Sequence, residues 1–366
     1  MLLLGQFFIR ESMKAVILVG GLGTRLRPLT LHTPKAMVPV LNVPFLEHVL
    51  RRLADGGVRE AVLALSHFAP AIESYFGRGH NLGINLEYVV ESSPLGTAGA
   101  ARNALGHIQD TCLIMNGDIF TGLDIVAMKE HHDAARARAT IALTAVDNPR
   151  AYGLVETAEN GRVRRFLEKP SPHEITTNMI NAGTYIIEPE VLASIPPDTV
   201  VSFEREVFPA LLTRGEGVFS FTDHSYWIDI GTPAKYHKLN QDLLLNQAPC
   251  LPKTEGIRDH SQIHPGARLE GPVLLCDGCR LDEGVVVQGP AVIGPKCCLG
   301  TGAIVSNAVI WHNVAVGAGC SIEDSVIGNN CTLESSCRLS DCVIGDHITL
   351  SHGYCQTGGQ IWPGLA

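Results

Sequence analysis

Short apolar runs alternate with amphipathic segments along the first two thirds of the chain. The runs are rich in Val, Ile and Leu, which is typical of strands buried on both faces. They lie at 15–19, 58–65, 84–90, 111–115 and 140–146. Segments whose apolar residues have helical spacing lie at 45–53, 96–108 and 124–135. This alternation predicts an α/β fold with a doubly wound, mostly parallel sheet.

The last third of the chain has aliphatic residues at every sixth position. The phase later slips by one residue in every three hexads, so a coil there spans 17 residues. The repeated positions are Ile263, Leu269, Leu275, Leu281, Val287, Ile293, Leu299, Val305, Ile310, Val316, Ile322, Ile327, Leu333, Leu339, Ile344 and Leu350. A hexapeptide repeat predicts a parallel β-helix, whose coils bury their apolar face only by stacking.

Six of the eleven cysteines lie two residues before a repeated aliphatic position. They are Cys279, Cys297, Cys320, Cys331, Cys337 and Cys342. Residues i and i−2 of a strand point the same way, so these cysteines are predicted to fill the interior as small apolar groups. Only Cys276 and Cys279 have the spacing of a zinc-binding pair, and a zinc site of this type needs two pairs. We expect free thiols and a reducing, cytoplasmic setting.

These patterns predict the domain limits. Residues 1–12 are an N-terminal extension, 13–246 form the α/β domain, and 263–366 form the β-helix with a short C-terminal tail. Residues 247–262, with two prolines and mixed charge, are the predicted linker. Thr232-Pro233 predicts the start of the last α/β-domain helix.

Composition excludes several classes of protein. The net charge of −9 and the lack of a basic stripe argue against binding to nucleic acid. No apolar run reaches the length of a membrane span, and the N-terminus has no basic n-region or small-residue cleavage site. We therefore expect no membrane association.

A glycine-rich loop follows the first predicted strand. Gly20, Gly21 and Gly23 let the backbone turn sharply, and successive N–H groups in such a loop can bind an anion. Arg25 and Lys35 add positive charge, so a phosphate-rich ligand is expected. The loop matches neither the P-loop pattern nor the dinucleotide-binding pattern. On spacing alone, a tight turn with solvated arginines is the alternative.

The whole stretch, GGLGTRLRPLTLHTPK, resembles the sugar-nucleotide pyrophosphorylases, a family of nucleotidyltransferases. Within that family, PLGTAGA at 94–100 is most similar to the mannose-1-phosphate guanylyltransferase branch. The resemblance implies a Rossmann-like catalytic domain over 13–246 and a left-handed β-helix after it. The implied reaction joins an NTP to a sugar 1-phosphate and releases pyrophosphate. The implied product is GDP-mannose, made from GTP and mannose 1-phosphate.

The resemblance also implies roles for individual residues. Arg25, Lys35 and Lys169 would be catalytic, and Asp118 and Asp229 would hold Mg²⁺. The nucleotide would contact Gly20, Gly21, Gly23, Thr24, Glu91, Gly96 and Thr97. The sugar phosphate would contact Gly153, Glu168, Lys169, Asn181 and Gly183. Taken singly, each aspartate also fits a turn former or helix cap, and Thr97 also fits a helix cap.

Three alternatives stay open at this point. The substrates could be glucose 1-phosphate with UTP, dTTP or ATP. The chain could be a non-catalytic regulatory homologue, although Arg25, Lys35, Lys169 and both aspartates are present. The β-helix could also carry an acyltransferase site with His312, His347 or His352 as general base. The unbroken hexads argue against that site, and we expect the β-helix to mediate homo-oligomerisation.

Overall fold

The computed structural model describes residues 13–66, 68–248, 256–257 and 260–364. The predicted extension at 1–12 lies outside the described residues, as does most of the predicted linker. The chain forms two compact units. The first contains residues up to Gly20, Leu50–Gly117 and Asp124–His224, and the second contains Gly21–Val49, Asp118–Leu123 and the chain from Ser225.

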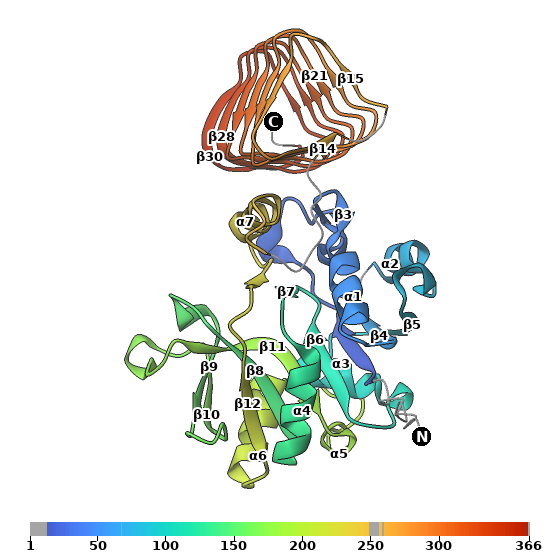
Figure 1. Ribbon diagram of the computed structural model, residues 1–366, viewed down its shortest axis with the longest axis vertical. Coiled ribbons are helices and arrows are strands. Elements are labelled where there is room, and N and C mark those ends of the chain that lie inside the picture. The colour runs from blue at the N-terminus through green and yellow to red at the C-terminus, as the bar shows by residue number, and fades with distance from the viewer. Residues whose placement is uncertain (1–12, 67, 249–255, 258–259, 365–366) are drawn as a thin grey trace, which may run out of the picture. The chain divides into compact units, whose positions relative to one another are not determined.

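A mixed nine-stranded sheet forms the centre of the first unit (Figure 1). Its strands are β1 (Ala15–Leu18), β4 (Glu60–Leu65), β5 (Asn85–Val90), β6 (Cys112–Asn116), β8 (Ala139–Ala145), β9 (Gly153–Thr157), β10 (Val163–Glu168), β11 (Met179–Ile187) and β12 (Val218–Thr222). The strands β6, β1, β4 and β5 are parallel neighbours, as the sequence predicted. Beyond β6 the sheet continues through β11, which pairs antiparallel with β6, β8 and β9.

Helices pack against this sheet and close its core. Those of the first unit are α2 (Ala69–Phe76), α3 (Gly96–Asn103), α4 (Ile125–Ala135), α5 (Pro189–Ala193) and α6 (Phe208–Thr213); α1 (Phe45–Asp55) begins in the second unit. α3 packs on β1 and β4, and α4 packs on β8, β11 and β12. α3 is shorter than predicted, because a separate 3₁₀ turn covers Leu105–His107. The predicted Rossmann-like arrangement is confirmed.

The described part of the second unit contains two small ribbons, helix α7 and a parallel β-helix, besides the start of α1. β2 (Pro39–Val40) pairs with β3 (Val43–Pro44), and β7 (Ile119–Thr121) pairs with β13 (Trp227–Asp229). α7 (Pro233–Leu244) follows β13. Thr232 caps α7, since its side chain accepts a hydrogen bond from the Lys235 N–H, and Pro233 occupies the first turn.

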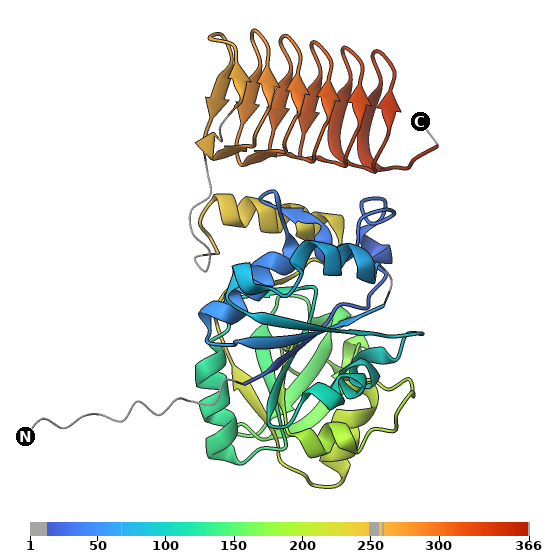
Figure 2. The same ribbon diagram turned by 90° about the vertical axis from the view of Figure 1, so that its right-hand side faces the viewer.

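The coils of the β-helix stack through short parallel strands (Figure 2). One ladder contains β15 (Gln262–Ile263), β18 (Arg280–Leu281), β21 (Cys298–Leu299), β24 (Ala315–Val316), β27 (Thr332–Leu333) and β29 (Thr349–Leu350). A second contains β16 (Arg268–Glu270), β19 (Val286–Gln288), β22 (Ile304–Ser306), β25 (Ser321–Glu323), β28 (Arg338–Ile344) and β30 (Cys355–Ile361). A third contains β14 (Gly256–Ile257), β17 (Val273–Leu275), β20 (Ala291–Ile293), β23 (Val309–Ile310), β26 (Val326–Ile327) and the end of β28.

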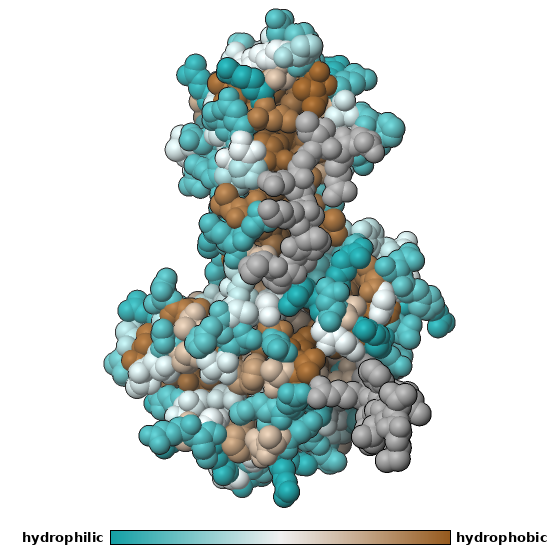
Figure 3. Space-filling model, viewed as in Figure 1, coloured by the Kyte–Doolittle hydropathy of each residue, from teal (hydrophilic) through white to brown (hydrophobic). Residues whose placement is uncertain are grey.

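The interior of the β-helix follows the predicted register. The repeated aliphatic residues from Leu275 to Leu350 and the six predicted cysteines are buried in one apolar cluster. Burial raises the pKa of the Cys331 and Cys337 thiols to about 11 each, so these groups stay protonated and unreactive. In the space-filling view, the near end of the β-helix shows hydrophobic residues ringed by hydrophilic ones (Figure 3).

One outward-facing row of the β-helix is also apolar. Leu274, Val292, Val309 and Val326 stand next to inward residues and are aligned along the third ladder. Each is nevertheless at most 3% exposed. Within the second unit, α7 packs on β20, and Trp311 donates a hydrogen bond from Nε1 to the Tyr236 hydroxyl at 2.8 Å. The β-helix is therefore docked on α7 through an apolar face, beyond its own closed interior.

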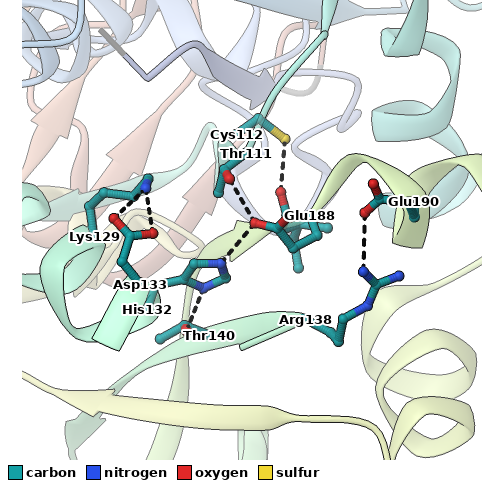
Figure 4. Close-up of polar contacts among 10 residues, drawn as sticks. Thr111, Cys112, Lys129, His132, Asp133, Arg138, Thr140, Glu188 and Glu190 are labelled. Atoms are coloured by element: carbon teal, nitrogen blue, oxygen red, sulfur yellow. Dashed lines mark hydrogen bonds and ion pairs between the residues drawn. The ribbon is translucent and has the colours of Figure 1, made fainter. Parts of the chain in front are cut away.

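A buried polar network joins α4, β8 and the end of β11 in the first unit (Figure 4). His132 is 2% exposed; its Nδ1 lies 2.7 Å from Thr140 Oγ1 and its Nε2 lies 3.1 Å from Glu188 Oε1. A neutral ring satisfies both contacts, because Nε2–H donates to the carboxylate and Nδ1 accepts from the hydroxyl.

No helix among the described residues is both long and apolar enough to cross a membrane.

The network makes stability depend on pH. Desolvation lowers the pKa of His132, although the Glu188 carboxylate opposes that shift. The unfolded chain therefore binds this proton more readily, and the free energy of unfolding falls as the pH drops through the ordinary histidine range. We expect the free energy of unfolding of His132→Gln to fall less than that of the wild type between about pH 7.5 and about pH 5.5. Its slope against pH should be shallower than the wild-type slope by at most about 1.4 kcal/mol per pH unit.

Urea unfolding at several pH values measures this slope. His80→Gln, at an exposed histidine of the same unit, is the matched control and should keep the wild-type slope. Parallel curves for His132→Gln and the wild type would contradict the assignment.

Candidate functional site

The phosphate-binding candidates Arg25 and Lys35 lie on one compact segment of the second unit. A 3₁₀ turn, Thr24–Leu26, carries Arg25, and a second one, Lys35–Met37, begins at Lys35. The Thr30 hydroxyl donates to the Gly23 carbonyl at 2.7 Å and closes the loop. Gly23 has φ +61°, and a Cβ there would lie 3.0 Å from Lys35 Cβ, so glycine is needed for both conformation and space. Arg25 itself is exposed.

The ribbon of β7 and β13 brings the two predicted metal ligands together. Asp118 directly precedes β7, and Asp229 ends β13 opposite Ile119. The Ile230 N–H donates to the Asp118 carbonyl at 3.0 Å, which extends the pairing by one residue. Asp229 is 6% exposed, and the Asp118 side chain is 31% exposed. Both aspartates therefore lie at the same end of one ribbon.

Cations surround these carboxylates. Lys35 Nζ lies 2.5 Å from Asp118 Oδ2, and Lys235 forms an ion pair with Asp229. The Arg25 guanidinium passes over Gly231, where an added Cβ would lie 3.3 Å from Nη2. Three positive side chains thus gather at two carboxylates. The group keeps a net positive charge that suits a phosphate-rich ligand.

The donor set fits a magnesium ion bound together with phosphates. Mg²⁺ at such sites takes one or two carboxylates and fills its remaining positions with phosphate oxygens and water. Asp118 and Asp229 supply two carboxylates. Among the described residues there is no group of three or more Asp, Glu, His or Cys that could hold a metal by itself. An ion here would therefore depend on the oxygens of its ligand.

The first unit contains four of the residues predicted to contact the nucleotide, namely Gly20, Glu91, Gly96 and Thr97. The Ser66 hydroxyl donates to the Gly20 carbonyl at 2.6 Å, and a Cβ on Gly20 would lie 3.4 Å from Glu91 Oε2. Glu91 is 9% exposed, and burial raises its pKa although the Leu95 N–H hydrogen-bonds to the carboxylate. Its Oε1 has no hydrogen-bond partner among the described residues. Gly20 and Glu91 are therefore neighbours, with one buried acceptor unused.

The start of α3 has a strong structural reason for its composition. Gly96 has φ +73°, and a Cβ there would lie 2.6 Å from the Val201 carbonyl oxygen. That oxygen accepts from the Ala98 and Gly99 N–H groups, so these N–H groups are already satisfied. The alternative that Thr97 caps the helix is wrong, because Leu95 is the N-cap residue. Thr97 lies inside α3, where its hydroxyl donates to Glu204 Oε2 at 2.7 Å and accepts from the Phe203 N–H.

Glu168 and Gly153 face each other across β9 and β10. A Cβ on Gly153 would lie 2.9 Å from Glu168 Oε2, so only glycine leaves room for that carboxylate. Burial raises the pKa of Glu168, and the nearby Glu204 carboxylate raises it further. Lys169 follows with φ +53° and an exposed side chain; its N–H donates to the Tyr152 carbonyl.

Asn181 and Gly183 lie in an irregular stretch of β11, where its pairing with β8 shifts. Gly183 has φ +71°, and its N–H donates to Asn181 Oδ1 at 2.9 Å. Asn181 Nδ2 donates to the Tyr185 hydroxyl, which donates in turn to Glu204 Oε1 at 2.9 Å. Glu204 thus joins Thr97 of α3 to Asn181 of β11.

Sequence reasoning missed three residues that complete these groups. They are Lys235, Glu204 and Ser66. Lys235 could have been noticed, since it lies six residues after Asp229 in the first turn of a predicted helix. Glu204 could not, because it sits in a π-helix, Phe203–Val207, that has no sequence signature of its own.

A separate pocket of about 490 Å³ lies at the amino ends of β1, β4 and β6, the opposite edge of the sheet from Glu91. Its lining includes Lys14, Glu60, Lys129 and Glu188. These charges have partners within the protein: Lys14 pairs with Glu60 at 2.9 Å, Lys129 pairs with Asp133, and Glu188 accepts from Thr111 (Figure 4).

Comparison with known families matches both parts of the chain. Residues 14–246 match the nucleotidyl transferase family, and residues 257–355 match the EIF2B subunit epsilon LbH domain. The β-helix is accordingly left-handed, as the resemblance implied. The family generally uses a divalent metal.

Individual relatives agree with the family. Mannose-1-phosphate guanylyltransferase of Mycobacterium tuberculosis is 40% identical over 84% of this chain and 82% of its own length. UTP–glucose-1-phosphate uridylyltransferase of Synechocystis is 33% identical over 82% of this chain and 83% of its own. The crystal structure of HddC from Yersinia pseudotuberculosis, also solved with GMP-PN, superposes with a TM-score of 0.56 at 31% identity, covering 63% of this chain and 99% of HddC.

The geometry at α3 predicts a stability effect. Gly96→Ala should lower the free energy of unfolding by about 1–3 kcal/mol, because a left-handed backbone and a clash with the Val201 carbonyl are both imposed. Urea unfolding measures it. Gly106→Ala is the matched control, since a Cβ there meets nothing within 4 Å. Equal stability of the two variants would refute the steric role of Gly96.

Proposed function

The chain belongs to the nucleotidyl transferase family and is a sugar-1-phosphate nucleotidyltransferase, and we propose that its substrates are GTP and mannose 1-phosphate. A phosphate oxygen of mannose 1-phosphate attacks the α-phosphorus of GTP. The bond from that phosphorus to the oxygen bridging to the β-phosphate breaks. GDP-mannose and pyrophosphate are the products.

The observation that carries the substrate pair is the similarity to the mycobacterial mannose-1-phosphate guanylyltransferase over most of both chains. The uridylyltransferase relative is less similar, at 33% identity. PLGTAGA at 94–100 agrees with the guanylyltransferase branch. The buried Glu91 adds a chemical reason, since guanine offers N1–H and N2–H donors to a carboxylate oxygen that lacks a partner among the described residues.

Charge stabilisation is the main work we assign to the second unit. Arg25 and Lys35 bind the triphosphate and offset the charge that develops on the leaving pyrophosphate. Lys235 holds the Asp229 carboxylate in place through their ion pair. No protein nucleophile is needed, because the attacking oxygen belongs to the sugar phosphate.

Asp118 and Asp229 would hold Mg²⁺ together with phosphate oxygens. A bound Mg²⁺ would neutralise phosphate charge and draw the phosphate groups into a fixed arrangement. Before it binds, Lys35 and Lys235 balance the two carboxylates. These ion pairs therefore hold the two carboxylates in place.

The sugar phosphate is assigned to residues of the first unit. Lys169 binds the phosphate, and Glu168 and Asn181 bind sugar hydroxyls. Gly153 and Gly183 let the backbone approach the sugar. Gly21, Gly23, Thr24, Gly96 and Thr97 complete the nucleotide set, of which Gly96 and Thr97 also hold α3 in place. We further propose a cytoplasmic homo-oligomer that assembles through the β-helix.

A substrate matrix tests the proposed pair. Pyrophosphate release should be fastest, by kcat/KM, for GTP with mannose 1-phosphate among GTP, ATP, UTP and dTTP and the 1-phosphates of mannose and glucose. A clear preference for UTP or dTTP with glucose 1-phosphate would overturn the substrate pair. No release with any pair would favour a non-catalytic homologue.

The metal ligands predict a second result. Asp118→Asn and Asp229→Asn keep the shape but remove a charge, so each should lower turnover by on the order of 100-fold, as expected for a lost electrostatic stabiliser. A high Mg²⁺ concentration should restore part of the lost turnover in each variant. The double variant should be less than additive, since both residues serve one ion.

Steady-state turnover across a magnesium titration measures these effects. Asp277→Asn, at an exposed aspartate of the β-helix, should be unchanged. Wild-type turnover of Asp229→Asn at every magnesium concentration would show that Asp229 is a structural partner of Lys235 and Gly231 and not a metal ligand.

A further inference from the structure

The segment that carries Arg25 and Lys35 behaves as one packed body. Its members from Gly23 to Lys35 are joined by the Thr30–Gly23 hydrogen bond and by the close approach of Gly23 to Lys35. Leu26 and Leu29 are fully buried and anchor it. We call residues 23–35 the Arg25 segment. A displacement of any part of this segment is therefore expected to displace the side chains of Arg25 and Lys35.

The β-helix touches this segment at Pro28. A Cβ added to Gly345 would lie 3.0 Å from Pro28 Cβ and 3.1 Å from Pro363 Cδ. Gly345 lies directly after β28, and both Gly345 and Pro28 are buried. Pro28 is only three residues from Arg25. The absence of a side chain at Gly345 is what lets the two backbones approach this closely.

The next two residues of the same coil reinforce the contact. The His347 ring meets the His32 ring edge to face, with centroids 6.4 Å apart. Asp346 is 5% exposed; its Oδ1 accepts from the Asn329 N–H at 2.6 Å, which holds it in the coil. Its carboxylate interacts electrostatically with both histidines. The coil therefore contacts both Pro28 and His32 of the Arg25 segment.

α7 fastens the chain just beyond the Arg25 segment to the same β-helix. The Tyr236 hydroxyl donates to the Pro39 carbonyl and accepts from Trp311. The Leu41 N–H donates to Asn240 Oδ1 at 2.9 Å. His237 and Gln241 reach Asn307 of the β-helix. The route from the β-helix to the catalytic side chains is thus continuous within the second unit.

We propose that the coil containing Gly345, Asp346 and His347 positions Arg25 and Lys35 for the nucleotide. The proposal rests on the function proposed above. It gives the β-helix a part in turnover in addition to assembly. The sugar-side residues come from β9, β10 and β11 of the first unit, so a disturbance at Gly345 should affect the nucleotide side selectively.

Gly345→Ala in the full chain tests this. The new methyl group must displace Pro28 or Pro363, and a misplacement of catalytic groups by a fraction of an ångström to an ångström is costly. We expect kcat to fall by about 10-fold or more and the KM for GTP to rise, with the KM for mannose 1-phosphate within about twofold of wild type. Gly266→Ala is the matched control, because it lies in an exposed turn of the first coils and a Cβ there would come no closer than 3.3 Å to the His264 ring and 3.7 Å to the Glu283 side chain.

A double-mutant cycle separates positioning from general damage. If Gly345 acts through Arg25, Gly345→Ala should cost little in an Arg25→Ala background. The same full cost in both backgrounds, or equal rises of both KM values, would overturn the proposal. So would wild-type kinetics of a folded Gly345→Ala, whereas an inactive wild type would overturn the proposed function itself.

His347→Asn keeps the test decisive if Gly345→Ala fails to fold. His347 has φ +60°, a conformation that asparagine tolerates, so the variant removes only the ring beside His32. We expect the same selectivity for GTP with a smaller effect. If Gly345→Ala does not fold, unchanged kinetics of His347→Asn would refute the positioning role.

Discussion

The candidate site depends on two ion pairs, Lys35 with Asp118 and Lys235 with Asp229, which offset the charge of two carboxylates at one end of a two-strand ribbon. Asp118 and Asp229 are held side by side by the pairing of β7 with β13, and Lys35 and Lys235 each balance one of them. The lysines come from opposite directions along the chain, one before β7 and the other from the first turn of α7. Removal of either lysine therefore leaves its aspartate without that ion-pair partner.

Much of the fold could be predicted because its signals are local. The apolar runs predicted the strands β1, β4, β5, β6 and β8, and the hexad spacing predicted the inward residues of every coil from Leu275 onward. The antiparallel insertion of β11 could not be predicted, since its Val- and Ile-poor start and its bulge at Gly183 are set by pairing with three other strands. Long-range pairing leaves little mark on a single strand's own composition.

The candidate site divides in the same way. Residues in contiguous motifs, such as Gly23, Arg25 and Lys35, could be proposed from the sequence because their spacing is itself distinctive. Glu204 could not, since its importance comes from three donors, Thr97, Ser202 and Tyr185, that only the folded chain assembles. The outward-facing Val292 of β20 is buried, and only the folded chain shows that β20 packs on α7.

Because the coils of the β-helix stack regularly, the number of coils between two residues sets their distance along the β-helix axis. Trp311, Gly328 and Gly345 occupy equivalent positions in successive coils, each donating its N–H to the coil that follows. Since neighbouring strands are about 4.8 Å apart, Trp311 at α7 and Gly345 at Pro28 are separated by about 9.6 Å along the solenoid. A whole coil added or removed between them would preserve the apolar interior and still shift one contact against the other by one strand spacing. Relatives with a different number of coils in this interval would need a compensating change in the length of the 21–49 segment or of α7.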